Sequence, residues 1–504
     1  MECVMKQQTV RNARKLLDTF DEKPFDGDFV LPEYLPEMAA ILSCRLEPVI
    51  ENRQLGNGRL IVDGHVRVHV MYVDNSRSRL FTYEATQPFT STFNADGLSD
   101  PAISSLNTVV SYVNYRAIGP RRLDVRGAFR VYAVVYDTVS AELPSRSDRK
   151  DLCLLRCTAE HSLPAQCTGK VFTVNEVLDA GGDTATKVIS CRAVASVSEC
   201  KVLSERAIIK GEIRVHSLYE TAGGSEETPE YSVCDHTLLY SQVIDAKGLA
   251  DELQTDCSVS VLSCDVRAER EEGTGRNVLL ANLQLSATLC AWEHTVTPYL
   301  ADAYSTACLT ETMLTDCIGY RYDGCAIRRL PLRQELELPE GVADVVDLWC
   351  DCLSVNHSDG IATHRLSVHL LASDESGILS CYERTVDFET PLNVSGDLPQ
   401  YRLQILECDY RRKDADTLEL AVVTELLVTD MTSKNFRAVS SVSTDDTHPY
   451  TFGNAAVRMI FAESGESVWQ ISKNCHTDVD TVLCANNLKE DVLTDKQVLL
   501  IPLK

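Results

Sequence analysis

Residues 60–72 read LIVDGHVRVHVMY, and residues 207–219 read AIIKGEIRVHSLY. In the first stretch Val66, Val68 and Val70 alternate with arginine and histidine. Alternation of apolar and polar residues with a period of two is typical of a strand with one buried face. Both stretches are therefore predicted to be half-buried β-strands.

These stretches belong to a longer internal repeat. Residues 41–72 align with residues 188–219 without a gap, at a constant offset of 147 residues. The identical pairs are Ser43/Ser190, Cys44/Cys191, Arg45/Arg192, Arg59/Arg206, Ile61/Ile208, Gly64/Gly211, Arg67/Arg214, Val68/Val215, His69/His216 and Tyr72/Tyr219. A more diverged third copy is suggested by HRLSVHLL at 364–371. Such self-similarity indicates repeated structural units.

A second pair of strands follows in each copy, at 109–137, 259–293 and 401–430. In the first two copies the polar connection between these strands contains glycine, as a hairpin requires. We therefore expect a mainly β protein of tandem antiparallel units, each a β-sandwich or a pair of packed β-subdomains. The order of the strands stays open.

The C-terminal tail has a different pattern. An apolar strand at 457–463 is followed by S-x-x-Q at 467–470 and T-x-x-D at 477–480, and the chain closes with QVLLIP at 497–502. The S-x-x-Q and T-x-x-D spacings are typical of capping boxes at helix starts. The tail is therefore predicted to be a small α+β module in the order βααβ.

One further helix is expected near the N-terminus, where Val10, Ala13, Leu16 and Leu17 would share one helical face. A chain of 504 residues is too long for a single core. The predicted layout is a helical segment at 1–28, repeats at 29–165, 166–305 and 306–448, and the module at 455–504.

Composition narrows the class of partner. The net charge is −26, which opposes binding to a phosphate backbone or an anionic bilayer. There is no run of 18 apolar residues and no apolar segment after the first charges, so we expect a cytoplasmic protein without membrane insertion. The 20 cysteines are scattered and are expected to be mostly buried, reduced thiols. Oxidative cross-linking in a late assembly is the alternative.

Catalytic patterns are missing from the sequence. It contains no phosphate-binding loop, dinucleotide fingerprint, zinc-protease motif or nucleophile elbow. His69, His216 and His369 recur once per repeat, but each lies in an alternating strand, so we expect structural histidines hydrogen-bonded within the sheet. Arg67 and Arg214 are expected to be cross-strand charge partners. We therefore expect a non-enzymatic protein without cofactor, metal or catalytic residues.

Two family resemblances add to this interpretation. VDGHVRVHVMYVD and IKGEIRVHSLYET resemble the SPOCS (DUF3794) domain of endospore-forming bacteria. The tail, with GESVW at 465–469, ANNL at 485–488 and LIP at 500–502, resembles a LysM module, although TDKQ at 494–497 replaces the family's Pro-Gly-Gln turn. SPOCS repeats followed by one LysM resemble clostridial spore coat morphogenetic proteins of the SipL type.

The combined resemblance implies a coat scaffold in the mother cell, at the forespore surface or in the spore coat. Its LysM module would dock a coat protein partner, a self-assembling coat ATPase. The alternative is a peptidoglycan-binding protein whose module recognises N-acetylglucosamine polymers, including chito-oligosaccharides.

The LysM resemblance also implies the contact residues, which lie in two loops beside a shallow groove. The candidates are Gly465, Glu466, Ser467 and Val468 in the first loop, and Asn487, Leu488, Lys489, Glu490, Asp491, Val492 and Leu493 in the second. Trp469 could stack on a sugar ring. We expect it instead to be used for packing, because so small a module needs core volume.

Overall fold

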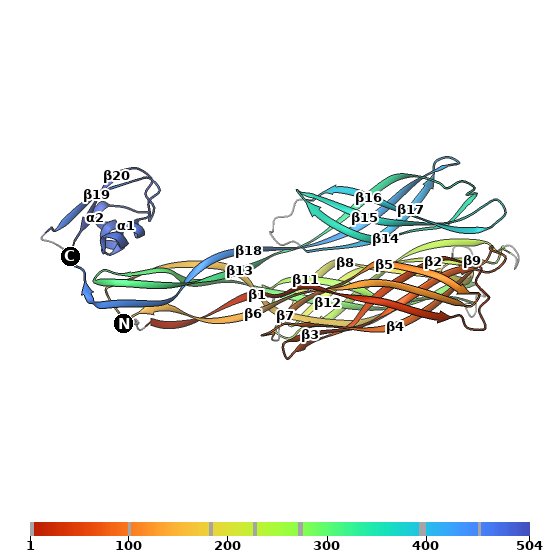
Figure 1. Cartoon of the computed structure of the whole chain (residues 1–504), viewed down its shortest axis with the longest axis horizontal. Helices are drawn as coiled ribbons and strands as arrows, with labels where there is room; N and C mark the ends of the chain where they lie inside the picture. Colours follow the sequence, from red (N-terminus) through yellow and green to blue (C-terminus); the bar gives the residue numbers. More distant parts are fainter. Residues whose placement is uncertain are drawn as a thin grey trace.

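The computed structural model describes residues 5–98, 102–180, 185–224, 229–270, 276–392, 400–451 and 455–503. It shows an elongated molecule with three units of antiparallel strands and a small module at one end (Figure 1). The prediction of a mainly β protein with repeated antiparallel sheets is confirmed.

Each unit has six strands in the same order. The first strand joins the fifth and sixth in one sheet, and the second to fourth strands form a meander in another. Unit 1 contains β1 (Met5–Val30), β2 (Ala40–Gly56), β3 (Arg59–Val73), β4 (Leu80–Asn94), β5 (Ile103–Gly119) and β6 (Arg122–Ser147). Unit 2 contains β7 (Leu152–Asp179), β8 (Ala185–Leu203), β9 (Arg206–Thr221), β10 (Tyr231–Asp245), β11 (Gln254–Arg270) and β12 (Asn277–Ser305). Unit 3 contains β13 (Cys308–Glu337), β14 (Asp344–Ser358), β15 (Ile361–Ser373), β16 (Leu379–Pro391), β17 (Gln400–Arg412) and β18 (Thr417–Pro449).

The two sheets of each unit pack face to face. In unit 1, Val66 and Val68 of the meander share a core with Phe129 and Val131 of β6, and all four are almost fully buried. Units 2 and 3 have equivalent cores. The alternating residues of the repeats therefore supply the inner faces of three sandwiches.

The N-terminal helix prediction is wrong. Residues 5–30 form strand β1, which pairs with β6 over nearly its whole length. Val10 and Ala13 are buried, but Val10 packs against Leu143 and Ala438 in a strand assembly. The long-range pairing outweighs a weak local periodicity.

The first strand of each unit also changes the domain limits. Unit 2 begins with β7 at Leu152, so the predicted boundary at 165/166 falls inside that strand. Segment 1–28 is likewise part of unit 1, because β1 completes its second sheet. The sequence alone does not show which strands pair with β1 and β7, so it could not assign these two strands to their units.

The first and last strands of every unit are longer than the rest and project as two-stranded ribbons. β5 pairs with β6 only as far as Tyr136, whereas β1 stays paired with β6 as far as Ser147. The three ribbons pack together as a stalk around Tyr136, Trp292 and Tyr322 (Figure 1). A two-stranded ribbon is only marginally stable alone, so the ribbons stabilise one another.

Gly64 and Gly211 occupy equivalent positions in β3 and β9. A Cβ atom at Gly211 would overlap with the Ser196 carbonyl oxygen and with the Tyr240 hydroxyl oxygen. Phe89 covers Gly64 in the same way. The shared glycine therefore leaves room for an aromatic ring and a neighbouring backbone.

Replacing Gly211 by alanine should lower the free energy of unfolding by about 1–3 kcal/mol, because the backbone carbonyl cannot move away without distorting the sheet. Denaturant unfolding measures the loss. Gly119→Ala is the control, since nothing lies within 4 Å of a Cβ at that position. Equal stability of the two variants would contradict this account.

The C-terminal module follows the predicted order. It consists of β19 (Val457–Ala462), α1 (Val468–Cys475), α2 (Val479–Asn486) and β20 (Gln497–Pro502), and β19 pairs antiparallel with β20. Its own core includes Val468, Ile471, Val482 and Leu499. No helix among the described residues combines the length and apolar character needed to cross a membrane.

The two predicted capping boxes are not formed. Ser467 is the N-cap of α1 but makes no side-chain cap bond, and Gln470 donates to Asn474 instead. The N-cap of α2 is Asp478, which accepts a hydrogen bond from the Thr481 amide. The Thr477 hydroxyl bonds the Pro502 carbonyl in the module's interior, so it cannot cap the helix.

Candidate interaction site

The two predicted contact loops lie side by side in the structure. The Gly465 amide donates to the Leu493 carbonyl at 2.7 Å, and the Val468 amide donates to the Asp491 carbonyl at 2.8 Å. Ser467 forms an isolated β-bridge with Val492. Segments more than twenty residues apart thus form one continuous surface.

Not every predicted residue is available on this surface. Val468 and Leu493 are buried in the module's core, and Leu488 packs partly against it. Ser467 is half-buried. The exposed candidates are Gly465, Glu466, Asn487, Lys489, Glu490, Asp491 and Val492. The accessible part of the site is therefore mostly polar and carries more acidic than basic side chains.

Trp469 is used for packing, as predicted, but its partner lies outside the module. Its indole Nε1 donates to Asp302 Oδ2 at 2.9 Å, and its ring meets Tyr304 edge-on at 4.9 Å between centroids. Lys473 also contacts Asp302 at 2.7 Å, and the Tyr304 hydroxyl donates to the Thr477 carbonyl. The α1 side of the module is therefore fastened to the end of β12 and is not free to stack on a sugar.

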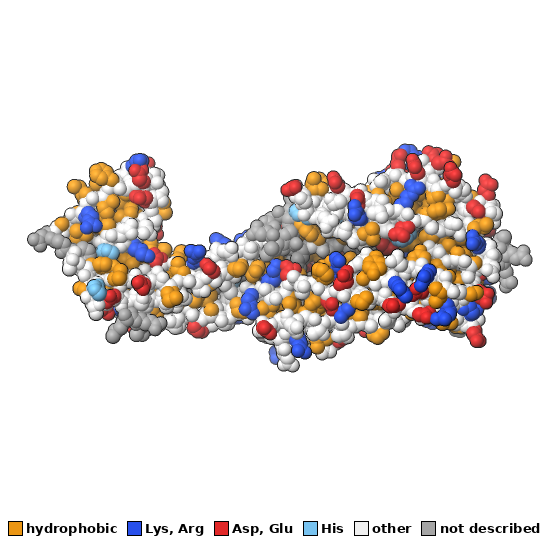
Figure 2. Space-filling model, viewed as in Figure 1, with side chains coloured by type: hydrophobic (Ala, Val, Ile, Leu, Met, Phe, Trp, Pro, Cys, Tyr) orange, Lys and Arg blue, Asp and Glu red, His pale blue; other side chains and the backbone are white. Residues whose placement is uncertain are grey.

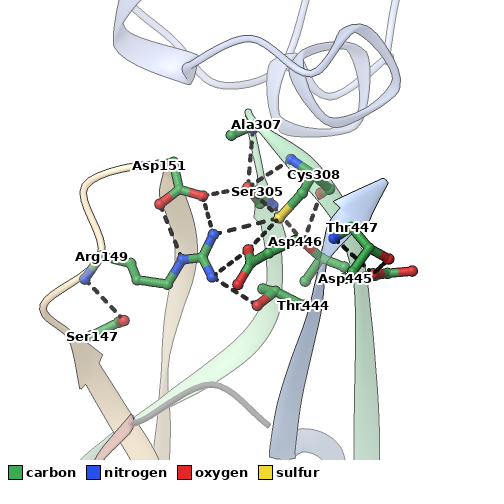
Figure 3. Close-up of polar contacts among 11 residues, drawn as sticks. Ser147, Arg149, Asp151, Ser305, Ala307, Cys308, Thr444, Asp445, Asp446 and Thr447 are labelled. Atoms are coloured by element: carbon green, nitrogen blue, oxygen red, sulfur yellow. Dashed lines mark hydrogen bonds and ion pairs between the residues drawn. The ribbon is translucent and has the colours of Figure 1, made fainter. Parts of the chain in front are cut away.

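At the tip of the stalk, beneath the module, one arginine holds neighbouring segments together (Figure 3). Arg149 donates to both Asp151 carboxylate oxygens, to Thr444 and to Asp446, at 2.7 to 3.1 Å. The hydrogen bond from Arg149 is the main reason that the pKa of Asp151 falls to about 2. Because these residues come from the β6–β7 connection and from β18, Arg149 links ribbons of units 1 and 3.

An exposed apolar surface on the module was not predicted. We call it the outer sheet face, and it consists of Val457, Met459 and Phe461 of β19 with Val498 and Leu500 of β20. Met459 pairs with Leu500 and Phe461 with Val498, so these side chains project from the same side of the sheet. Phe461 is 86% exposed and Met459 70%. Figure 2 shows hydrophobic side chains gathered on this module.

The sequence contained a signal for this face. Ile460, Ala462, Leu499 and Ile501 line the inner side of the same two strands. A strand that is apolar on both sides is typical of a sheet covered on both faces. The described residues provide a cover for one of them only.

The histidines of the three units have structural contacts. His69 bridges Glu84 and Glu47, each at 3.0 Å, within its own sheet, and His369 contacts Asp351 at 3.3 Å. Arg67 pairs across the strands with Glu47, as expected. Arg214 instead contacts Glu407 of unit 3. Within the described ranges, no three His, Cys, Asp or Glu side chains gather in a way that could hold a metal ion.

His216 differs from the other two because it joins two units. Its Nδ1 contacts Asp235 of unit 2 at 2.8 Å, and its Nε2 contacts Asp347 of unit 3 at 3.0 Å. Asp347 is 1% exposed and also faces Arg192, which lies over the Trp349 ring. Burial alone would lower the pKa of His216, but hydrogen bonds to the two carboxylates raise it to about 9.

Between the three units lies a cavity of about 1800 Å³, lined by strands of all three. Its wall includes ionic, hydroxyl and thiol side chains, among them Arg53, Arg402, Asp256 and Cys167. The cavity wall therefore combines apolar side chains with charged, hydroxyl and thiol groups from all three units.

Comparison with known families identifies part of this architecture. Residues 37–118 and 184–269 match the family described as SipL, SPOCS domain. The matched segments cover β2–β5 of unit 1 and β8–β11 of unit 2, which are equivalent strands. The SPOCS resemblance is thus confirmed for these two units and suggests a sporulation-related protein. No curated protein and no solved structure matches the chain.

Proposed function

We propose that this protein is a non-enzymatic scaffold in spore coat morphogenesis, acting at the forespore surface. Three stacked β-units supply length and lateral contacts, and the C-terminal module, taken as LysM-like, docks a coat protein partner. The family resemblance implies a self-assembling coat ATPase as that partner. The SPOCS match in units 1 and 2 supports the sporulation context.

The outer sheet face is the observation that carries the docking proposal. It presents five apolar side chains on a module whose opposite side is held to the stalk by Trp469 and Lys473. The apolar face is therefore directed away from the rest of the chain, where a partner can reach it. Tyrosine, tryptophan and other large anchors at the centre of such a face usually dominate binding energy.

The charge of the module indicates which kind of partner surface would complement it. Glu466, Glu490 and Asp491 are exposed on the paired loops of the same module. An apolar patch flanked by lysine or arginine would complement this combination. We therefore expect the coat partner to present such a patch rather than an acidic surface.

Phe461→Asp in the full-length protein should weaken binding to the purified coat ATPase about 30-fold, because a charged group in an apolar hot spot costs about 2 kcal/mol. Biolayer interferometry measures the change. Leu239→Asp is the matched control, since Leu239 is 82% exposed on β10 of unit 2. Unchanged binding by the Phe461 variant would exclude the outer sheet face as the docking site.

Glycan recognition is tested in parallel by co-sedimentation of the same proteins with purified peptidoglycan. Sedimentation that chito-oligosaccharides compete away, together with no affinity for the ATPase, would replace the docking proposal with wall binding. Trp469 is the side chain best suited to stack on a sugar, but it packs against the stalk. This contact argues against glycan binding.

A further inference from the structure

Cys167 and Cys290 lie directly opposite each other on β7 and β12 of unit 2. Their sulfur atoms are 3.0 Å apart, and both cysteines are free thiols. Directly opposed residues of antiparallel strands have Cα atoms about 4.5–5.5 Å apart, which is within the span of a disulfide. The strand register therefore allows this pair to close without movement of the sheet.

A guanidinium group from unit 1 contacts one of the two sulfurs. Arg53 Nη2 donates to Cys167 Sγ at 2.8 Å, while its Nη1 donates to the carbonyl and the hydroxyl of Ser104 at 3.1 and 2.7 Å. Arginine stays protonated in proteins, so its contact favours the thiolate form of the cysteine. The positive charge is fixed in place by unit 1, whereas the thiols belong to unit 2.

The two sulfurs are electrostatically unequal. The hydrogen bond with Cys290 and the adjacent Arg53 lower the pKa of Cys167, although burial opposes this. For Cys290, the hydrogen bond with Cys167, burial and the charge of Asp256 all raise the pKa. These shifts favour the thiolate form at Cys167 and the neutral thiol form at Cys290.

Both cysteines lie in the wall of the cavity between the units. Arg53, Ser104, Cys167 and Cys290 all line the cavity between the three units, and neither cysteine is fully buried. A cavity of this size accommodates a tripeptide disulfide. Reactive cysteines characteristically combine such access with a nearby positive charge.

We propose that Cys167 and Cys290 form a redox-active dithiol that reacts with small disulfides of the oxidised glutathione type. The Cys167 thiolate attacks one sulfur of the small disulfide, forming a mixed disulfide and releasing one small thiolate. Cys290 then loses its proton to that thiolate and attacks the Cys167 sulfur, which forms the cross-strand disulfide and releases a second small thiolate. The protein loses two electrons and the one proton of Cys290, and the small disulfide is reduced to one thiol and one thiolate.

Oxidation changes the contact between units 1 and 2. The disulfide has no thiolate charge, so Arg53 retains only its two Ser104 acceptors. The redox state of the cysteine pair in unit 2 therefore changes a contact made by Arg53 of unit 1.

A second pair in the chain serves as an internal reference. Cys350 and Cys408 of unit 3 have sulfurs 3.1 Å apart, but the hydrogen bond with Cys350 and burial raise the pKa of Cys408. The two pairs therefore have similar sulfur separations, and the Cys167–Cys290 pair is distinguished by the Arg53 contact and by its place in the cavity wall.

The test exposes the reduced full-length protein to graded ratios of oxidised to reduced glutathione, followed by alkylation and peptide mass spectrometry. We expect the disulfide-linked Cys167–Cys290 peptides to form about tenfold faster than the Cys350–Cys408 peptides, because rate follows the thiolate fraction. Equal rates, or earlier closure of Cys350–Cys408, would overturn the proposal.

Two variants separate this chemistry from a general change in folding. Cys290→Ser should accumulate glutathione on Cys167, because the resolving thiol is absent. Arg53→Met should slow oxidation of Cys167 about tenfold and leave the Cys350–Cys408 rate unchanged. No glutathione adduct on the serine variant, or equal slowing of both pairs in the methionine variant, would contradict the assigned roles.

Discussion

Replacement of Asp347 by alanine should lower the free energy of unfolding by about 3–5 kcal/mol, the range found when one partner of a buried ion pair is removed. Asp347 is 1% exposed and contacts both His216 and Arg192. Without it, two cationic groups remain in the junction between units 2 and 3, and burial already lowers the pKa of Arg192.

Asp235→Ala is the matched control for this variant. Asp235 contacts the other nitrogen of the same histidine, but its side chain is 70% exposed. Because exposed ion pairs contribute about 0–1 kcal/mol, this variant should be close to wild type. Urea unfolding, with hydrogen exchange to locate the change, distinguishes the two. Similar losses from both variants would show that burial does not govern this junction.

The protein should also lose stability as the pH rises through about 9, the value to which the pKa of His216 is raised. A raised histidine pKa means that the folded state holds the proton more tightly than the unfolded state. The contribution is thus complete below about pH 6.5, where the unfolded histidine is also protonated, and it is lost above the folded pKa. The contribution of His216 to the free energy of unfolding is at most about 3 kcal/mol.

The midpoint temperature of unfolding, measured from pH 6 to 10 under reducing conditions, tests this dependence. Comparison with His216→Gln isolates the histidine, because other groups titrate equally in both proteins. The stability advantage of the wild type should shrink as the pH passes 9. A constant difference over the whole range would contradict the proton linkage.

Local pattern was sufficient to predict most strands. Val66, Val68 and Val70 are buried, as their alternation with arginine and histidine predicted, and the 147-residue offset places Arg45 opposite His69 and Arg192 opposite His216. Sheet burial imposes a period of two on every such strand. The N-terminal segment was misassigned because its spacing also suits a helix, and only pairing with β6 decides between them.

The sequence predicted which loops form the candidate site, but not which of their side chains are exposed. The two loops of the module do meet, yet Val468 and Leu493 point into its core. Phe461 and Met459 were placed in the correct strand, but their exposure depends on which face of the sheet α1 and α2 cover. A strand that is apolar on both sides does not say which side stays open.

The sequence by itself determined the tandem β-units, the βααβ tail and the equivalence of the histidines, because these depend on periodicity and on internal repetition. Only the tertiary structure decided that Trp469 is fastened to Asp302, that His216 meets Asp347 of another unit, and that Arg53 meets Cys167. Each of these contacts joins residues more than 100 positions apart. Their geometry follows from how three units pack around one stalk and one cavity, which no local pattern encodes.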